Sequence, residues 1–286
     1  MQFVPEKSQI AIGEGMEVTM RRLKESERSR LREYLLAEPE INLFFIGLIE
    51  NNSINSDDVM VFAEESGTDQ DMKWDIVILR YYDNYVLYSY DDIFPVKKVV
   101  DFLKMDIVDS LNGKASVLRK IAPFFPHMKM EEKVTLRLDG LNETAIDKGK
   151  VKLRLLTPQD AGKIVELYSL SKDCALNYGK EKNDYIAERR GRLAGEGIAI
   201  GLIYKHRLVS VAEIAADNDI TGLIVGIATH PKYYGRGFAT QAITALCEEA
   251  FRRGKKHICF LHENSNTTSL LKNIGFEEKN QFALLH

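Results

Sequence analysis

The chain has 286 residues, of which 45% are hydrophobic and 28% charged, values that are ordinary for a folded, water-soluble protein of one large or two medium domains. The net charge of −3 excludes the overall basic field by which many proteins bind nucleic acid. No apolar run approaches the roughly 18–20 residues that span a bilayer, and the N-terminus lacks a signal pattern, so we expect a cytoplasmic protein that has no membrane partner.

The first half of the chain predicts alternating strands and helices from its apolar periodicity. Strands are expected at residues 17–23, 59–64, 73–82, 84–90, 114–118 and 134–138, the last of them at a sheet edge. Helices are expected at residues 25–36, 42–49 and 94–111, the last ending at Asn112-Gly113.

The second half restarts the same order after the polar segment 139–150. Strands are expected at residues 151–156, 197–204, 208–216, 223–228, 255–261 and 277–286. Helices are expected at residues 157–171, 178–193, 239–253 and 267–274. Thr157-Pro158 is a good start for the first of these helices, with Thr as N-cap and Pro at the first helical position.

This repeated order indicates a duplicated α+β unit, and the sequence predicts two domains, residues 1–145 and 146–286. The halves differ in charge: residues 1–150 hold 20 basic and 27 acidic residues, whereas residues 151–286 hold 19 and 15. A positive second half favours an anionic ligand there. Of the three cysteines, Cys247 and Cys259 are expected to be buried, and Cys174 lies in a polar connection. No spacing suggests a metal site.

The segment 223–254 reads as strand, turn and helix, with Gly235-Arg236-Gly237 in the turn. The first N–H groups of a helix have no internal partner and lie at the positive end of its dipole, so such a turn can bind a phosphate. On the glycines alone, a tight turn that needs them only for its geometry is an equal alternative. The corresponding stretch of the first half has Asp91-Asp92 and no glycine, and two acids would repel a phosphate.

With the downstream residues, the second half resembles the GNAT acyltransferase superfamily. The loop Tyr234–Ala239 matches the family's Q/R-x-x-G-x-G/A pattern at Gly237 and Ala239 and departs from it at Tyr234. Asn264-x-x-Thr267 and Gly275-Phe276 resemble the family's next helix and its end. The whole chain resembles tandem GNAT proteins with a degenerate N-terminal copy, and also the glycine N-acyltransferase-like subgroup. The fold implied is two GNAT-like domains, each a mixed, mostly antiparallel sheet flanked by helices.

The resemblance implies acetyl-CoA as cosubstrate and no metal. Its pyrophosphate would lie on the loop residues Tyr234, Gly235, Arg236, Gly237, Phe238, Ala239 and Thr240. Its pantetheine arm would run along Ile227, Ala228 and Thr229, and Asn264, or else Asn266, would bind the arm from the other side. The implied reaction is direct attack on the thioester by an amine, which belongs to a small molecule or a peptide. The resemblance also leaves a homodimer open.

The acid and base of such a reaction are harder to place. The family's positions for them fall on Leu223 and Leu271, which cannot transfer protons. Glu213 is the remaining catalytic candidate, because it shares a strand face with Val209 and Val211. A solvent-facing acid at the strand end is the alternative for Glu213. His230 next to Pro231 is expected to shape the turn, and Tyr178 to pack over the acceptor site.

Two other functions stay open. The first is a CoA-binding regulatory module without turnover, which the leucines at 223 and 271 motivate. The second is a dinucleotide-binding enzyme, which would need a third glycine where Thr240 stands and an acid after the next strand, where Glu263 alone is poor support.

Overall fold

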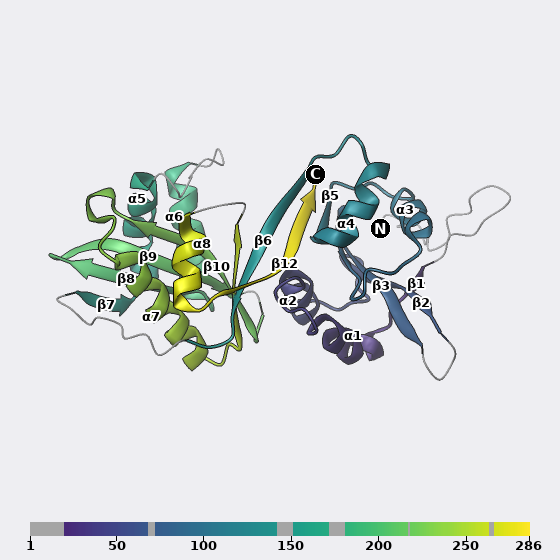
Figure 1. Ribbon diagram of the computed structural model, residues 1–286, viewed down its shortest axis with the longest axis horizontal. Coiled ribbons are helices and arrows are strands. Elements are labelled where there is room, and N and C mark those ends of the chain that lie inside the picture. Colours follow the sequence, from purple (N-terminus) through teal and green to yellow (C-terminus); the bar gives the residue numbers. More distant parts are fainter. Residues whose placement is uncertain (1–19, 68–71, 142–150, 172–180, 217, 263–265) are drawn as a thin grey trace, which may run out of the picture.

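A computed structural model of the full chain gives its fold (Figure 1). The structure describes residues 20–67, 72–141, 151–171, 181–216, 218–262 and 266–286. Cys174, Tyr178, Glu263 and Asn264 lie outside the described residues, as does the predicted boundary at 145 and 146.

The N-terminal half alternates strands and helices. Its strands are β1 (Arg21–Arg22), β2 (Val59–Ser66), β3 (Lys73–Tyr81), β4 (Asn84–Tyr88), β5 (Ser110–Lys114) and β6 (Met130–Leu138). Its helices are α1 (Arg28–Leu35), α2 (Leu43–Asn51), α3 (Val96–Leu103) and α4 (Ala115–Ile121). One core cluster packs α1 and α2 against one sheet face, and a second packs α3 and α4 against the other.

The C-terminal half repeats this order. Its strands are β7 (Lys152–Leu155), β8 (Ile198–Tyr204), β9 (Arg207–Ala216), β10 (Thr221–Thr229), β11 (His257–His262) and β12 (Glu277–Leu285). Its helices are α5 (Ala161–Leu170), α6 (Lys182–Ala194), α7 (Phe238–Arg252) and α8 (Asn266–Ile274). The predicted duplication of the α+β unit is therefore confirmed element by element.

Three predicted elements are wrong. The helix expected at 94–111 ends at Leu103, and Leu111 belongs to strand β5, because its apolar side chain continues the stripe but packs from a strand. Residues 115–118, expected as a strand, begin helix α4, so Asn112-Gly113 lies within β5 and ends no helix. Strand β6, expected at an edge, lies in the middle of the sheet.

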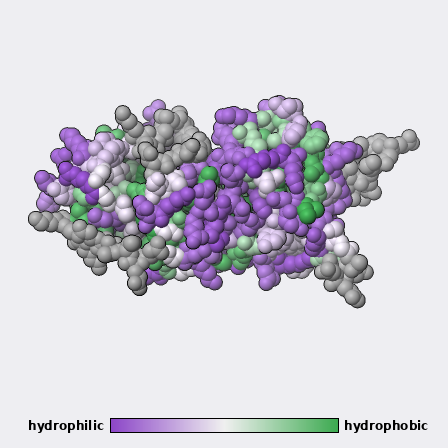
Figure 2. Space-filling view, viewed as in Figure 1, coloured by the Kyte–Doolittle hydropathy of each residue, from purple (hydrophilic) through white to green (hydrophobic). Residues whose placement is uncertain are grey.

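The twelve strands form one continuous sheet in the order β1-β2-β3-β4-β5-β12-β6-β11-β10-β9-β8-β7. The last strand of each half has thus moved into the sheet of the other: β12 pairs antiparallel with β5 of the first half, and β6 pairs antiparallel with β11 of the second. These two strands also pair with each other and join the two lobes (Figure 1). Along the face shown in Figure 2, hydrophilic side chains cover the region between the lobes.

Helix α5 begins as the sequence predicts, behind a capping box. The Asp160 carboxylate accepts from the Thr157 backbone N–H at 3.1 Å and from two guanidinium nitrogens of Arg154 at 2.7 and 2.8 Å. The hydrogen bonds from Arg154 hold the pKa of the Asp160 carboxyl well below its usual range. A carboxylate so bound ties strand β7 to the start of α5.

We expect Asp160→Asn to lower the free energy of unfolding at pH 7 by about 1–3 kcal/mol, since the charge-assisted bonds are lost. A lowered pKa stabilises the fold above the unfolded-state pKa of about 3.9 and loses this effect as pH falls through the folded-state value. The difference between wild type and variant should therefore shrink below about pH 4. Urea unfolding across this pH range measures it, and a constant difference would contradict the assignment.

Candidate functional site

The two halves differ where their parallel strands meet. In the N-terminal half β4 pairs with β5 from Asn84 to Leu87, nearly the full length of β4. In the C-terminal half, the described residues of β10 and β11 pair from Thr221 to Leu223 only, although β10 continues to Thr229. A register shift between Ile224 and Gly226 turns β10 at this point. The C-terminal half therefore opens between its parallel strands.

A cavity of about 520 Å³ lies at this opening. It is lined by Ile227 and Thr229 of β10, by every residue from Tyr233 to Thr240, by Ser171, and by Thr267 and Leu270 of α8. Of the residues predicted to bind the cosubstrate, Ile227, Thr229 and the loop from Tyr234 to Thr240 are thus brought together. The side chain of Ala228 is buried on the other face of β10, against Tyr168.

The turn before α7 presents free N–H groups to this cavity. Gly237 is the N-cap of α7 and has a left-handed backbone, with φ of 71°. It has no side chain to cap the helix, and the Gln241 N–H is the first to bond back, to the Gly237 carbonyl at 3.1 Å. The N–H groups of residues 238–240 therefore have no partner within the helix, and they lie where the positive end of the dipole attracts an anion.

Arg236 and Tyr233 flank the turn. The Arg236 guanidinium lies 5.4 Å from the centre of the Tyr233 ring, and its side chain is exposed. Tyr234, which departs from the family pattern, is 48% exposed and lines the cavity wall. His230 begins the turn, as predicted, since its Nδ1 accepts from the Lys232 backbone N–H at 3.2 Å.

The N-terminal half is closed at the corresponding place. A Cβ added to Gly113 of β5 would lie 2.1 Å from the Leu87 carbonyl oxygen of β4, so the two strands touch there. Beyond them, the buried Lys114 ammonium contacts the Tyr90 carbonyl at 2.9 Å, Glu38 at 3.1 Å and Asp92 at 3.3 Å. This ion cluster fills the position that the phosphate-type turn leaves open in the other half.

Glu213, the predicted catalytic residue, lies away from the cavity. Its side chain is fully buried on β9, and its Oε1 accepts from Arg189 Nε of α6 at 3.1 Å. Burial lowers the pKa of Arg189 and the charge of Glu213 raises it; the net shift is upward, which keeps the guanidinium charged. The second carboxylate oxygen of Glu213 has no hydrogen-bond partner among the described residues.

The sequence did not reveal the partners of Glu213. The Arg189 guanidinium lies 5.1 Å from the centre of the Tyr168 ring, and Tyr168 of α5 packs directly on Gly226, where β10 bends. A Cβ at position 226 would lie 1.9 Å from the Tyr168 oxygen. Tyr168, Arg189 and Glu213 therefore form a buried group beneath the bend in β10. A glycine within an apolar strand is the one sequence signal for this close approach.

We expect Gly226→Ala to destabilise the protein by about 1–3 kcal/mol, because the new methyl group must displace the Tyr168 ring. Gly191→Ala is the control. Gly191 is exposed in helix α6, and no described atom lies within 4 Å of its Cβ position, so this change should stabilise by roughly 0.5–1 kcal/mol through helix propensity. Chemical unfolding followed by circular dichroism compares the two. Equal effects of both substitutions would refute the close packing at Gly226.

Leu223 and Leu271, at the family's positions for base and acid, are both buried core residues, as are Cys247 and Cys259. No group of three or more His, Cys, Asp or Glu side chains that could hold a metal ion occurs in the described part of the chain. Among the helices that the structure describes, none has the length and apolar character to cross a membrane.

Residues 164–276 match the model of the acetyltransferase (GNAT) family. The family model thus matches most of the C-terminal half. The match begins within α5 and ends just after α8, so it contains the opened strands, the glycine turn and the 520 Å³ cavity. A search of the curated proteins found no sequence match.

Solved structures share the fold of the whole chain. A structural-genomics target from Drosophila has a TM-score of 0.61 at 15% identity, covering 93% of this chain and 98% of its own. A GCN5-related N-acetyltransferase from Sphaerobacter thermophilus has 0.56 at 11%, covering 93% and 94%. A tandem GNAT protein from the clavulanic acid biosynthesis pathway has 0.53 at 11%, covering 93% and 97%. The predicted tandem GNAT architecture is confirmed.

Proposed function

We propose that the protein is an acetyl-CoA-dependent N-acetyltransferase with a single active site in its C-terminal half. The observation that carries the proposal is the contrast between the halves. One half has an open cavity at an uncapped helix N-terminus beside separated strands, and the other has paired strands and a buried ion cluster at the same place. A single site is therefore expected, with one acetyl-CoA per chain.

The residues at the cavity suit the parts of acetyl-CoA. The diphosphate would accept from the free N–H groups at the start of α7, where the helix dipole favours negative charge. The extended arm would lie along the cavity-facing edge of β10 at Ile227 and Thr229, because a strand edge offers backbone donors and acceptors. A backbone N–H of this edge would stabilise the thioester oxygen as its charge develops.

The acceptor would be an amine on a small molecule or a peptide, which must be neutral to attack the thioester. Glu213 is the acid nearest the bend in β10 along the sheet, since it pairs with Gly226. Its burial and its bond to Arg189 suit a residue that fixes Tyr168 and the bend, and a proton would reach its unpartnered oxygen only through a bound water. Positioning of the two substrates then supplies much of the rate.

A CoA-binding regulatory module is the second candidate. The observation in its favour is that Leu223 and Leu271 are core residues and that Arg189 holds the carboxylate of Glu213. Such a module would bind CoA as tightly as an enzyme but would not consume acetyl-CoA.

Calorimetric titration with acetyl-CoA, followed by a thiol-release assay against a panel of small and peptide amines, tests both candidates. Saturable binding of one acetyl-CoA per chain with amine-dependent thiol release supports the enzyme. Tight binding of acetyl-CoA without thiol release in the presence of any amine supports the module. An absence of acetyl-CoA binding would refute both candidates.

A further inference from the structure

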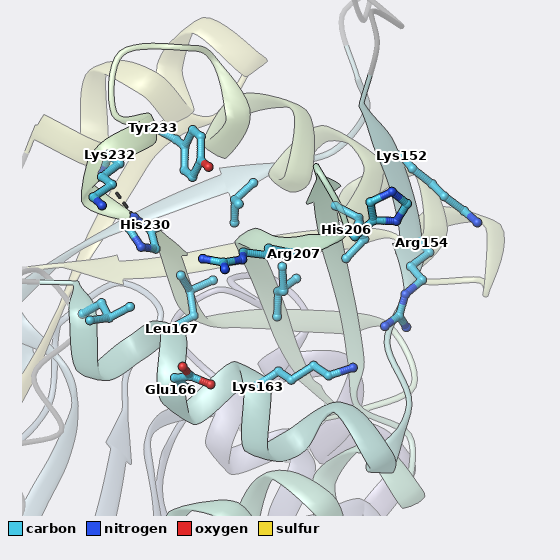
Figure 3. Close-up of a pocket in the computed structure, with 14 residues that line it drawn as sticks. Lys152, Arg154, Lys163, Glu166, Leu167, His206, Arg207, His230, Lys232 and Tyr233 are labelled. Atoms are coloured by element: carbon cyan, nitrogen blue, oxygen red, sulfur yellow. Dashed lines mark hydrogen bonds between the residues drawn. The ribbon is translucent and has the colours of Figure 1, made fainter.

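A second and larger cavity, of about 840 Å³, lies on the other side of the loop between β10 and α7. Tyr233 lines both cavities, so the loop separates them. Side chains from β7, α5, the β8–β9 turn and the β10–α7 loop converge on the larger cavity (Figure 3). None of the described residues that the family resemblance assigns to acetyl-CoA lines this cavity.

Positive charge is concentrated there. Among the described residues, five lysine and arginine side chains line the cavity, Lys152, Arg154, Lys163, Arg207 and Lys232, against the single carboxylate of Glu166. Arg154 and Lys163 share the carboxylate of Asp160, at 2.7 and 3.5 Å. Within the described ranges the other three cations, on Lys152, Arg207 and Lys232, form no ion pair. Like charges that converge without counter-charge destabilise a fold, and a bound anion would remove that cost.

The cations surround an apolar floor. Figure 3 shows Lys152, Arg154 and His206 on one side of the cavity and His230 and Lys232 on the opposite side, with Arg207 between them. The floor consists of aliphatic side chains, Leu167, Leu170, Ile203, Leu208 and Val209. A ligand that satisfies both parts must carry several separated negative charges and a flat or apolar body.

Two further features support a ligand. The β8–β9 turn places Lys205 and His206 in left-handed conformations, with φ of 48° and 63°, in a two-residue turn where glycine or asparagine is the usual choice. This turn brings His206 and Arg207 to the cavity at a cost in backbone strain. Because His230 Nδ1 accepts from a backbone N–H, a neutral His230 carries its proton on Nε2, where it can donate to an anion.

We propose that this basic cavity binds an organic polyphosphate, of which a nucleoside triphosphate is the type, independently of acetyl-CoA. Separated phosphates would contact the cations on both sides and Arg207 between them, by charge-assisted hydrogen bonds. The base would cover the aliphatic floor. The site thus places a second ligand next to the loop that also forms the wall of the acetyl-CoA cavity.

The test is calorimetric titration of the full-length protein with ATP, in the presence and in the absence of saturating CoA. We expect one ATP per chain in both conditions and an affinity that falls steeply as NaCl rises from about 50 to 500 mM, because salt screens the charges. No ATP binding, or ATP binding that CoA abolishes, would overturn the proposal. If CoA itself does not bind, the ATP titration alone still decides whether the basic cavity binds a polyphosphate.

Lys152→Glu/Arg207→Glu should weaken ATP binding at least roughly tenfold and leave CoA affinity unchanged. Arg190→Glu/Lys256→Glu is the matched control, since it makes the same change in net charge at exposed residues outside both cavities and should change ATP affinity by less than about twofold. If this charge-reversal variant fails to fold, the neutral variant Lys152→Gln/Arg207→Gln replaces it. Equal weakening by test and control variants would refute the site.

Discussion

Gly237→Leu should abolish acetyl-CoA binding while leaving the protein folded. A Cβ at this position would meet no described atom within 4 Å, and Gly237 lines the cavity, so we expect a larger side chain there to occupy cavity space. The side chain would therefore clash with the ligand and not with the core, and we expect affinity to fall by roughly 100-fold or more, about 2.7 kcal/mol. Calorimetric titration with CoA measures the loss.

Gly254→Leu is the matched control for this substitution. Gly254 follows the other end of α7, has φ of 97°, and also has open space at its Cβ position. Both variants bear the strain of a left-handed leucine, about 1–2 kcal/mol, but only position 237 faces the cavity. If Gly254→Leu weakens CoA binding as much as Gly237→Leu does, the loss reflects stability, and the site assignment fails.

The second large effect concerns the exchanged strands. Residues 146–286 contain the whole match to the acetyltransferase family, yet we expect this fragment not to fold alone. Without β6, strand β11 loses its antiparallel partner and β12 loses both of its neighbours. An exposed apolar edge of this kind promotes aggregation. Expression of the fragment with gel filtration and circular dichroism measures the outcome.

Coexpression with residues 1–145 is the control. The two fragments together supply every strand, so we expect them to copurify as a one-to-one complex with the circular dichroism spectrum of the intact chain. They should separate only in denaturant. A folded, monomeric 146–286 fragment would show that the halves are independent and that the exchange contributes little to stability.

Local signals in the sequence predicted much of this structure. The capping residues at Thr157 and Pro158, the glycine turn and the repeated element order all depend on neighbouring residues, and each appears in the fold. The prediction for residues 94–118 is wrong because apolar residues of α3, β5 and α4 share one core cluster, so their apolar stripe continues across two element boundaries. Helical periodicity alone cannot mark where such a stripe changes from helix to strand.

The remaining features are non-local. The exchange of β6 and β12 depends on pairing between distant segments, such as Lys114 with Phe282. The partners of Glu213 come from α5 and α6, and the basic cavity collects cations from positions 152 to 232. The excess of basic residues after position 150 hinted at an anion site but could not distinguish one cavity from two. The closed N-terminal copy was foreshadowed only by Asp91-Asp92.

The exchanged strands also determine when each half can complete its sheet during translation. The N-terminal half cannot complete its sheet until β12 has left the ribosome, because β12 fills the place between β5 and β6. Until then the nascent first half holds two unsatisfied strand edges, and pairings at such long sequence separation form slowly. A chaperone that shields these edges during translation would therefore raise the yield of native protein more than one that acts after release.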